Sequence, residues 1–386
     1  MKTGEFFRRV RYITLKLTRG CNLKCTYCNV DAFTPKTPRM SLEQFKLIAR
    51  LLIENSSAPF VGLEFHGGEP MLMSDEFFEE ATKYAMSLAR KHNKFVEFPL
   101  VTNGTLLTEE RLLKLSKLGI KFCISADGPP EINDLLRGSG RAVEAAIRLF
   151  QKNKVSFGCL SVLSKANCHR MYEVMDWFKE MNIRDFRLNF LQPQGRGADE
   201  SFLLSGEEMF EGIRGVMDHM VQTDVSVREE ETLLNVDRFL HGRNPKPGLS
   251  CWEHQCQAGR NYVAIDHEGT IHACGTDMSN HPLGKIEAEE FDEVHYENAL
   301  RALHHKGDWV IRCFDCDARQ ICRHSCSTSD YNSDNYKEYE CEYTKLLWNH
   351  MCEFPYKPER IRNIIQERTG SRGPGQFVPL TPLAAT

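Results

Sequence analysis

Short β-rich runs alternate with amphipathic helical patterns from Arg11 to about residue 190, and this alternation restricts the possible folds most strongly. Strand and helix alternating at this spacing predict a parallel sheet of right-handed βαβ units. Six units are fewer than the eight of a closed barrel, so we expect an α/β fold with a partial (β/α)6, TIM-like barrel. The expected strands are Tyr12–Leu17, Val61–Phe65, Val96–Val101, Phe122–Ser125, Val155–Leu163 and Phe186–Phe190, and the expected helices are Ser41–Ile53, Asp75–His92, Thr108–Leu118, Arg141–Lys152 and His169–Met181.

The remaining chain predicts a second, smaller unit. Residues 205–240 indicate one or two helices, and GRNPKPG at 242–248 is typical of a linker. Residues 249–345 are rich in cysteine and contain short strand patterns at Tyr262–Asp266 and Thr270–Ala273. We expect a barrel at 1–240, a C-terminal cysteine-rich domain at 241–348, and a helix with a mobile Gly/Pro-rich tail at 349–386.

Charge and hydropathy exclude several classes of protein. The formal net charge is -4 and the pI is near 6.4, and no polybasic block indicates a nucleic-acid partner. The longest apolar runs have the length of a strand, so no membrane span is expected. The N-terminus has no apolar secretory segment, and we expect a cytoplasmic protein.

The fifteen cysteines fall into groups, with three at residues 21–28 and eight at residues 251–341. Disulfides are typical of small secreted domains, so metal or cluster ligation is the better interpretation here. Cys123, Cys159, Cys168 and Cys352 lie outside the groups, and we expect them to be buried like small hydrophobic residues.

The first group, in TRGCNLKCTYCNV, is Cys21, Cys25 and Cys28, directly after the first expected strand. An iron–sulfur cube normally takes four thiolates, so three leave one iron without a protein ligand. A catalytic metal centre needs such an open position. The alternative is a zinc loop, for which Asp31 is a weak fourth ligand.

The spacing C-x3-C-x2-C with an aromatic residue before the third cysteine, Tyr27, resembles the radical S-adenosylmethionine (SAM) superfamily. The resemblance implies a [4Fe-4S] cluster that binds SAM, and an electron donor such as flavodoxin or ferredoxin. Reductive cleavage then yields a 5′-deoxyadenosyl radical that takes a hydrogen atom from the substrate.

Further motifs follow the next strands. In HGGEP, at 66–70, Gly67 and Gly68 would let the backbone approach a ligand, and Glu69 would accept from the amine of SAM, as in the family's GGEP motif. Alone, a glycine pair is more often a plain turn, and His66 has no assured role. The resemblance adds further cofactor-binding candidates: Tyr27, Asn103 in TNG, Ser125 in SADG, Arg137 and Asn189. For Asp127 a turn-closing role is an equal alternative, and for Arg137 an exposed surface charge is one.

The second group resembles the SPASM extension of radical SAM enzymes that modify peptides and proteins. Cys256-x12-Gly269-x4-Cys274 is followed by C-x2-C-x5-C-x3-C and a last cysteine. The resemblance implies two auxiliary [4Fe-4S] clusters, and a pair of zinc knuckles is the competing interpretation. The ligand sets it implies are Cys251, Cys256, Cys274 and Cys326 for cluster I, and Cys313, Cys316, Cys322 and Cys341 for cluster II.

Two groups of SPASM enzymes are similar to this chain. One crosslinks ribosomally made peptides through C–C or thioether bonds. The other oxidises a Cys or Ser of sulfatases to formylglycine, and also lacks an N-terminal peptide-recognition domain, as we expect here. There an Asp base directly follows the last cysteine of the first SPASM set, whereas here Gly275 and Thr276 precede Asp277. We therefore favour peptide crosslinking by net oxidation, with a peptide or protein substrate and Asp277 as the candidate base. A non-enzymatic iron–sulfur or zinc module stays as a further alternative.

Overall fold

The strands of the six expected βα units form the middle of a continuous ten-stranded sheet. The computed structural model describes residues 1–29, 32, 34–199, 203–223, 225–241, 256–276, 282–304, 313–322, 326 and 334–353. The strand order is β10-β9-β8-β1-β2-β3-β4-β5-β6-β7, and β1 to β6 are parallel neighbours in chain order. Their bounds are β1 Tyr12–Lys16, β2 Phe60–His66, β3 Phe95–Thr102, β4 Ile120–Ser125, β5 Phe157–Leu163 and β6 Asp185–Phe190. The short strand β7 (Arg228–Glu229) pairs in parallel with β6. The partial barrel is thereby confirmed.

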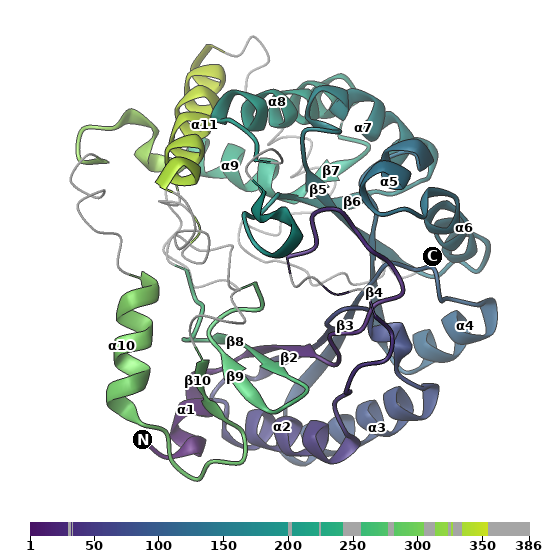
Figure 1. Ribbon diagram of the computed structural model, residues 1–386, viewed down its shortest axis with the longest axis vertical. Coiled ribbons are helices and arrows are strands. Elements are labelled where there is room, and N and C mark those ends of the chain that lie inside the picture. The colour runs from purple at the N-terminus through teal and green to yellow at the C-terminus, as the bar shows by residue number, and fades with distance from the viewer. Residues whose placement is uncertain are drawn as a thin grey trace.

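Helices cover the outside of the barrel, as Figure 1 shows. Two expected N-caps are present, because the side chains of Ser41 and Thr108 accept from the amides of Gln44 and Arg111. The stretch expected to hold one or two helices holds two. The helices are α2 Leu42–Asn55, α3 Asp75–Lys91, α4 Glu109–Lys117, α5 Pro130–Leu136, α6 Gly140–Lys152, α7 Met171–Glu180, α8 Gly206–Gln222 and α9 Glu230–His241.

The cysteine-rich region joins the barrel through the sheet. Strand β8 (Tyr262–Asp266) pairs in parallel with β1, and β9 (Thr270–His272) and β10 (Pro282–Lys285) continue the sheet as antiparallel strands. Gly269 has a φ of +75° in the turn between β8 and β9, a conformation that glycine adopts readily. The division at 240/241 stays a prediction, and the sheet itself continues across it.

Helix α1 (Thr3–Arg9) was not expected from the sequence, and it contacts the other end of the chain. Phe6 stacks on Phe291 with 4.7 Å between ring centroids and meets Tyr296 of α10 (Glu293–His304) edge-on. The amide of Thr3 donates to the carbonyl of Glu289 over 3.1 Å. The last helix, α11 (Asp334–Glu353), packs against α8. None of the described helices is long and apolar enough to cross a membrane. Of the helix and tail expected at 349–386, residues 354–386 lie outside the described residues.

Candidate active site

A cavity of about 650 Å³ opens at the carboxyl ends of the barrel strands. This edge of a parallel sheet is where α/β proteins bind ligands. The cavity is lined by residues that the sequence analysis selected from nine separate segments: Cys21, Cys25, Tyr27, Cys28, Gly67, Gly68, Glu69, Asn103, Ser125, Arg137, Asn189, Cys256, Cys274 and Cys326.

The first cysteine loop follows β1 and is held by backbone contacts. Thr26 donates its amide to the carbonyl of Leu136, and Arg196 Nε donates to the carbonyl of Cys25 over 2.7 Å. Burial raises the pKa of the Cys21 thiol to about 11, and burial also raises the pKa of Cys25. Buried thiols of this kind deprotonate when a metal binds them, because the metal supplies the compensating positive charge.

The two glycines of HGGEP allow the loop to approach the cysteine loop. The amide of Gly68 donates to the carbonyl of Thr18, and a Cβ added at Gly68 would lie 2.0 Å from the carbonyl oxygen of Gly20. Gly67 has a φ of +139°, which other residues rarely adopt. The close approach expected from the sequence is therefore present, but the neighbour it accommodates is the chain's own backbone.

Glu69 lies at the base of this loop and is 1% exposed. Its carboxylate accepts from the amides of Met71 and Asn103 and from the hydroxyl of Thr102, over 2.7–2.9 Å. Burial raises the pKa of this carboxyl, and these three donors act against that rise. The carboxylate is thus held in one orientation at the cavity wall.

Asn103 connects this wall to the first cysteine. Its side-chain amide donates to Asn22 Oδ1 over 3.0 Å and lies 3.9 Å from Cys21 Sγ. Ser125 ends β4, and Asn189 lies near the end of β6, so both also reach the carboxyl edge of the sheet.

A buried ion pair holds Tyr27, the aromatic residue before the third cysteine of the motif. Asp127 is fully buried and accepts two hydrogen bonds from Arg137, over 2.8 and 3.0 Å, and one from Tyr27 Oη over 2.5 Å. The guanidinium carbon of Arg137 lies 5.4 Å from the centre of the Tyr27 ring. Asp127 therefore does more than close a turn, and Arg137 is a buried cation rather than a surface charge.

The later cysteines lie in two environments, and the two expected ligand sets stay a prediction. Cys256, Cys274 and Cys326 line the cavity. Cys341, in α11, has its pKa raised first by burial, and the charges of Cys316 and Cys313 add to that rise. Cys322 lies at the end of a short 3-10 turn that Cys316 begins. Cys251 and the candidate base Asp277 lie outside the described residues.

A family profile described as the radical SAM superfamily matches residues 15–183. A cysteine-type anaerobic sulfatase-maturating enzyme of Clostridium perfringens is 34% identical over 279 residues, which cover 66% of this chain and 71% of that protein. The chain belongs to the radical SAM superfamily.

Two other radical SAM proteins match over most of the length. An AdoMet-dependent heme synthase of Nitratidesulfovibrio vulgaris is 24% identical over 381 residues, which cover 91% of this chain and 94% of that protein. The solved structure "Native anSMEcpe with bound AdoMet and Cp18Cys peptide" has a TM-score of 0.74 at 22% identity, with 93% of this chain and 99% of that chain covered. The expected fold and family are confirmed.

The described residues fit the cofactors that radical SAM enzymes use, a [4Fe-4S] cluster and SAM. Three buried or half-buried thiols face one cavity, and the cavity volume lies in the range usual for small-molecule sites. Additional cysteines at the same cavity fit an auxiliary cluster. The roles of individual residues toward these groups stay predictions.

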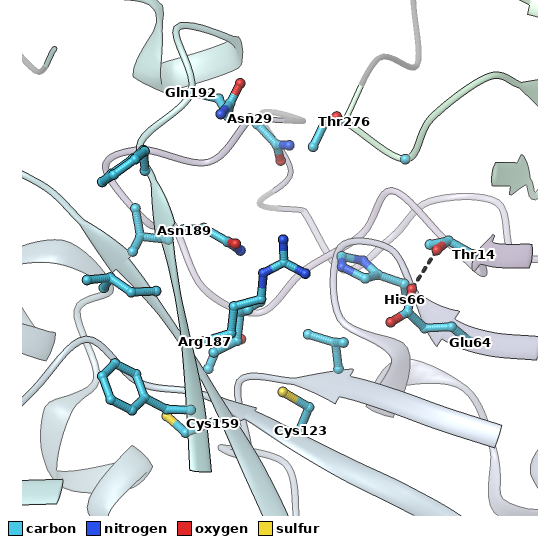
Figure 2. Close-up of a pocket in the computed structure, with 18 of the residues that line it drawn as sticks. Thr14, Asn29, Glu64, His66, Cys123, Cys159, Arg187, Asn189, Gln192 and Thr276 are labelled. Atoms are coloured by element: carbon cyan, nitrogen blue, oxygen red, sulfur yellow. Dashed lines mark hydrogen bonds between the residues drawn. The ribbon is translucent and has the colours of Figure 1, made fainter. Parts of the chain in front are cut away.

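Sequence reasoning missed a second set of polar side chains inside this radical SAM barrel. Lys16, Glu64, His66 and Arg187 line the cavity, and Figure 2 shows Arg187 reaching its centre between Asn189 and His66. The signal was present in β1, where Tyr12, Thr14 and Lys16 alternate with Ile13, Leu15 and Leu17. A barrel interior is usually filled with branched apolar residues, so polar residues at alternate positions indicate a functional face.

The four cysteines outside the two groups have different environments. Cys159 and Cys168 are buried as expected. The expectation was wrong for Cys352, which is exposed, and for Cys123, which is half-buried and lines the cavity because its side chain points to the barrel interior.

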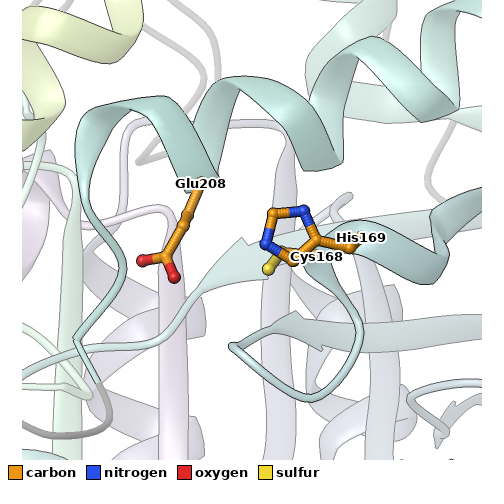
Figure 3. Close-up of side chains that lie close together, drawn as sticks. All are labelled: Cys168, His169 and Glu208. Carbon is orange, nitrogen blue, oxygen red and sulfur yellow. The ribbon is translucent and has the colours of Figure 1, made fainter.

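Cys168 lies outside the cavity beside His169 and Glu208 (Figure 3), with the three donor atoms within 4.8 Å of one another. Local structure explains two members of this cluster. Glu208 accepts from the amide of Ser205 in the capping box of α8, and Cys168 donates to the carbonyl of Lys165.

Proposed function

We propose that this protein is a radical SAM maturase that removes hydrogen from a residue of a ribosomally made peptide and forms a crosslink, of the C–C or thioether type, by net oxidation. One observation carries the proposal. Cys21, Cys25 and Cys28 share a cavity with Cys256, Cys274 and Cys326, so the proposed radical-generating site and the proposed electron acceptor face the same space. An oxidation needs both, because the substrate must lose a hydrogen atom and then an electron.

In this proposal the first three cysteines hold the SAM-binding cluster, which supplies the radical when SAM is cleaved. Glu69 accepts from the amine of SAM, and its three internal donors keep it oriented and oppose the rise of its pKa that burial causes. Tyr27, Asn103, Ser125, Arg137 and Asn189 complete the proposed cofactor wall. A flavodoxin or ferredoxin is the proposed electron donor.

The position after Cys274 favours crosslinking over formylglycine formation. Gly275 and Thr276 line the cavity, and no carboxylate occupies the position directly after the cysteine. Formylglycine formation is the second candidate, because the relative with 34% identity is a sulfatase-maturating enzyme. Since another relative is a heme synthase, the family alone does not select a peptide substrate.

The test is anaerobic reconstitution, addition of SAM and dithionite, and mass spectrometry of a candidate peptide. We expect 5′-deoxyadenosine and a product that has lost two hydrogens and resists fragmentation between the joined residues. Formylglycine from Ser also loses two hydrogens, so an aminooxy reagent separates the candidates by capturing only the aldehyde. Formylglycine from Cys loses the sulfur. Absence of 5′-deoxyadenosine would remove the enzymatic proposal.

A further inference from the structure

Lys16 places a buried cation between the two cysteine sets. It is the last residue of β1, is 5% exposed, and lines the cavity. Burial lowers the pKa of Lys16, and the charge of Glu64, followed by those of Cys274 and Cys28, acts against that lowering. A Cβ added at Gly275 would lie 3.5 Å from Lys16 Nζ, so the backbone just after Cys274 passes beside the ammonium.

His66 contacts this ammonium through a ring nitrogen that carries no proton. Nδ1 of His66 accepts from the amide of Gly67 over 2.7 Å and lies 3.3 Å from Lys16 Nζ. A ring nitrogen that accepts an amide proton carries none itself, so Lys16 is the donor in this contact. Burial first, and then Lys16, lower the pKa of His66 well below its usual value, so the imidazole is neutral.

The counter-charge for Lys16 lies deeper in the barrel. In the register of β1 and β2, Lys16 pairs with His66. Glu64 pairs with Thr14, which lies two residues before Lys16 and is therefore further from the carboxyl edge of the sheet. Thr14 donates to Glu64 Oε2 over 2.5 Å and contacts Tyr262 Oη over 2.9 Å. Lys16 thus lies at the carboxyl edge of the sheet beside Gly275, and the Glu64 carboxylate is held by Thr14 deeper in the same cavity.

We propose that Lys16 is a positioning residue for electron transfer, whose ammonium stabilises the electron received by the auxiliary cluster that Cys274 ligates. This inference rests on the proposed function, because only a net oxidation delivers that electron. The substrate loses a hydrogen atom to the 5′-deoxyadenosyl radical. When the new bond forms, the substrate loses a second hydrogen as a proton and an electron. Asp277 is the candidate acceptor of the proton. The auxiliary cluster would accept the electron and would then carry one more negative charge. A cation next to a group that becomes more negative favours its reduction.

The experiment is a redox titration, followed by electron paramagnetic resonance, in the full chain with Cys21, Cys25 and Cys28 replaced by Ala. This background leaves only the auxiliary clusters, and a further Cys341→Ala variant identifies the signal that belongs to cluster I. We expect Lys16→Met to lower the midpoint potential of cluster I and to leave cluster II unchanged. Lys16→Arg retains the cation and should restore the potential. Lys121→Met is the matched control. Lys121 lines the same cavity but lies near the amino end of β4, and it pairs with Glu97 over 2.9 Å.

A second pair of variants tests the inference if Lys16→Met does not incorporate clusters. Gly275→Asp places a carboxylate against the ammonium and should also lower the potential of cluster I, whereas Gly275→Asn adds a neutral side chain of the same size. Unchanged potentials in both Lys16→Met and Gly275→Asp would overturn the inference, as would equal shifts of both clusters. These titrations contain no substrate, so they test Lys16 separately from the product analysis that tests the proposed function.

Discussion

The carboxylate of Asp127 holds two neighbours of the cysteine loop at once, Arg137 and Tyr27. It also accepts from the amide of Val162 over 2.9 Å, which ties the ion pair to β5. A buried carboxylate with four donors fixes the direction of each of them. The stability of the cavity wall beside Cys25 therefore depends on one residue.

We expect Asp127→Asn to lower the free energy of unfolding by about 3–5 kcal/mol, because it leaves the buried guanidinium of Arg137 without its counter-charge. Anaerobic urea denaturation measures this change. The control is Glu144→Gln, which breaks the exposed pair between Glu144 and Arg148 and should cost no more than about 0.5 kcal/mol. Equal losses in the two variants would contradict the buried role of Asp127.

At the scale of elements, three consecutive glutamates, Glu229, Glu230 and Glu231, lie at the start of α9. Glu229 accepts from the amides of Thr232 and Leu188, so it both begins the helix and fastens it to β6. Burial raises the pKa of the next residue, Glu230, to about 8, while Arg187 acts against the rise. Glu230 therefore binds its proton more tightly in the folded protein than in the unfolded chain.

The pH dependence follows from that direction. The folded-state pKa of Glu230 lies above the ordinary value of 4.5, so ionisation lowers stability progressively as the pH rises from about 4.5 to about 8. We expect Glu230→Gln to leave the free energy of unfolding unchanged near pH 4.5 and to raise it by roughly 1–3 kcal/mol at pH 8 and above. Anaerobic thermal unfolding across this range measures the difference. The exposed Glu207 of α8, also changed to Gln, is the control, and a pH trend common to both variants would count against this account.

The contact between α1 and the C-terminal elements is a second test at this scale. Phe6 is fully buried between Phe291 and Tyr296. We expect Phe6→Ala to destabilise by about 3–5 kcal/mol, the usual cost of removing a buried aromatic ring. Phe60 and Phe95 are stacked with 4.9 Å between centroids but are 64% and 65% exposed. Phe95→Ala should therefore lower the free energy of unfolding much less, as measured by chemical denaturation. A similar decrease in both variants would show that α1 does not anchor the end of the sheet.

For the whole molecule, the proposed function predicts that the SAM-binding cluster can be removed while the auxiliary clusters remain. We expect the Cys21/Cys25/Cys28→Ala variant to retain about eight of about twelve irons and to lose SAM cleavage entirely. Iron and sulfide analysis and detection of 5′-deoxyadenosine measure both effects. Cys352→Ala, which removes an exposed cysteine, is the control and should retain both. Loss of all iron in the triple variant would show that the clusters assemble as one unit.

The alternation of strands and helices determined the partial barrel, because the hydrophobic period of each element is local in the sequence. The spacing of Cys21, Cys25 and Cys28 likewise determined the family, since the three ligands lie on one loop. HGGEP was identified as a motif, but the steric reason for its glycines, the approach to Thr18 and Gly20, needed the folded chain.

Only the tertiary structure decided the contacts between distant segments. The pairing of β8 with β1 joins residues about 250 positions apart and brings Gly275 beside Lys16. The partner of Arg137 is equally outside the reach of periodicity. The alternation in β1 indicates a polar inner face at Lys16, but its neighbours Glu64 and His66 follow only from the pairing of β1 with β2. The alternation of side chains along a strand shows which face a residue occupies. The neighbour that the residue contacts there depends on which strands pair and in what register.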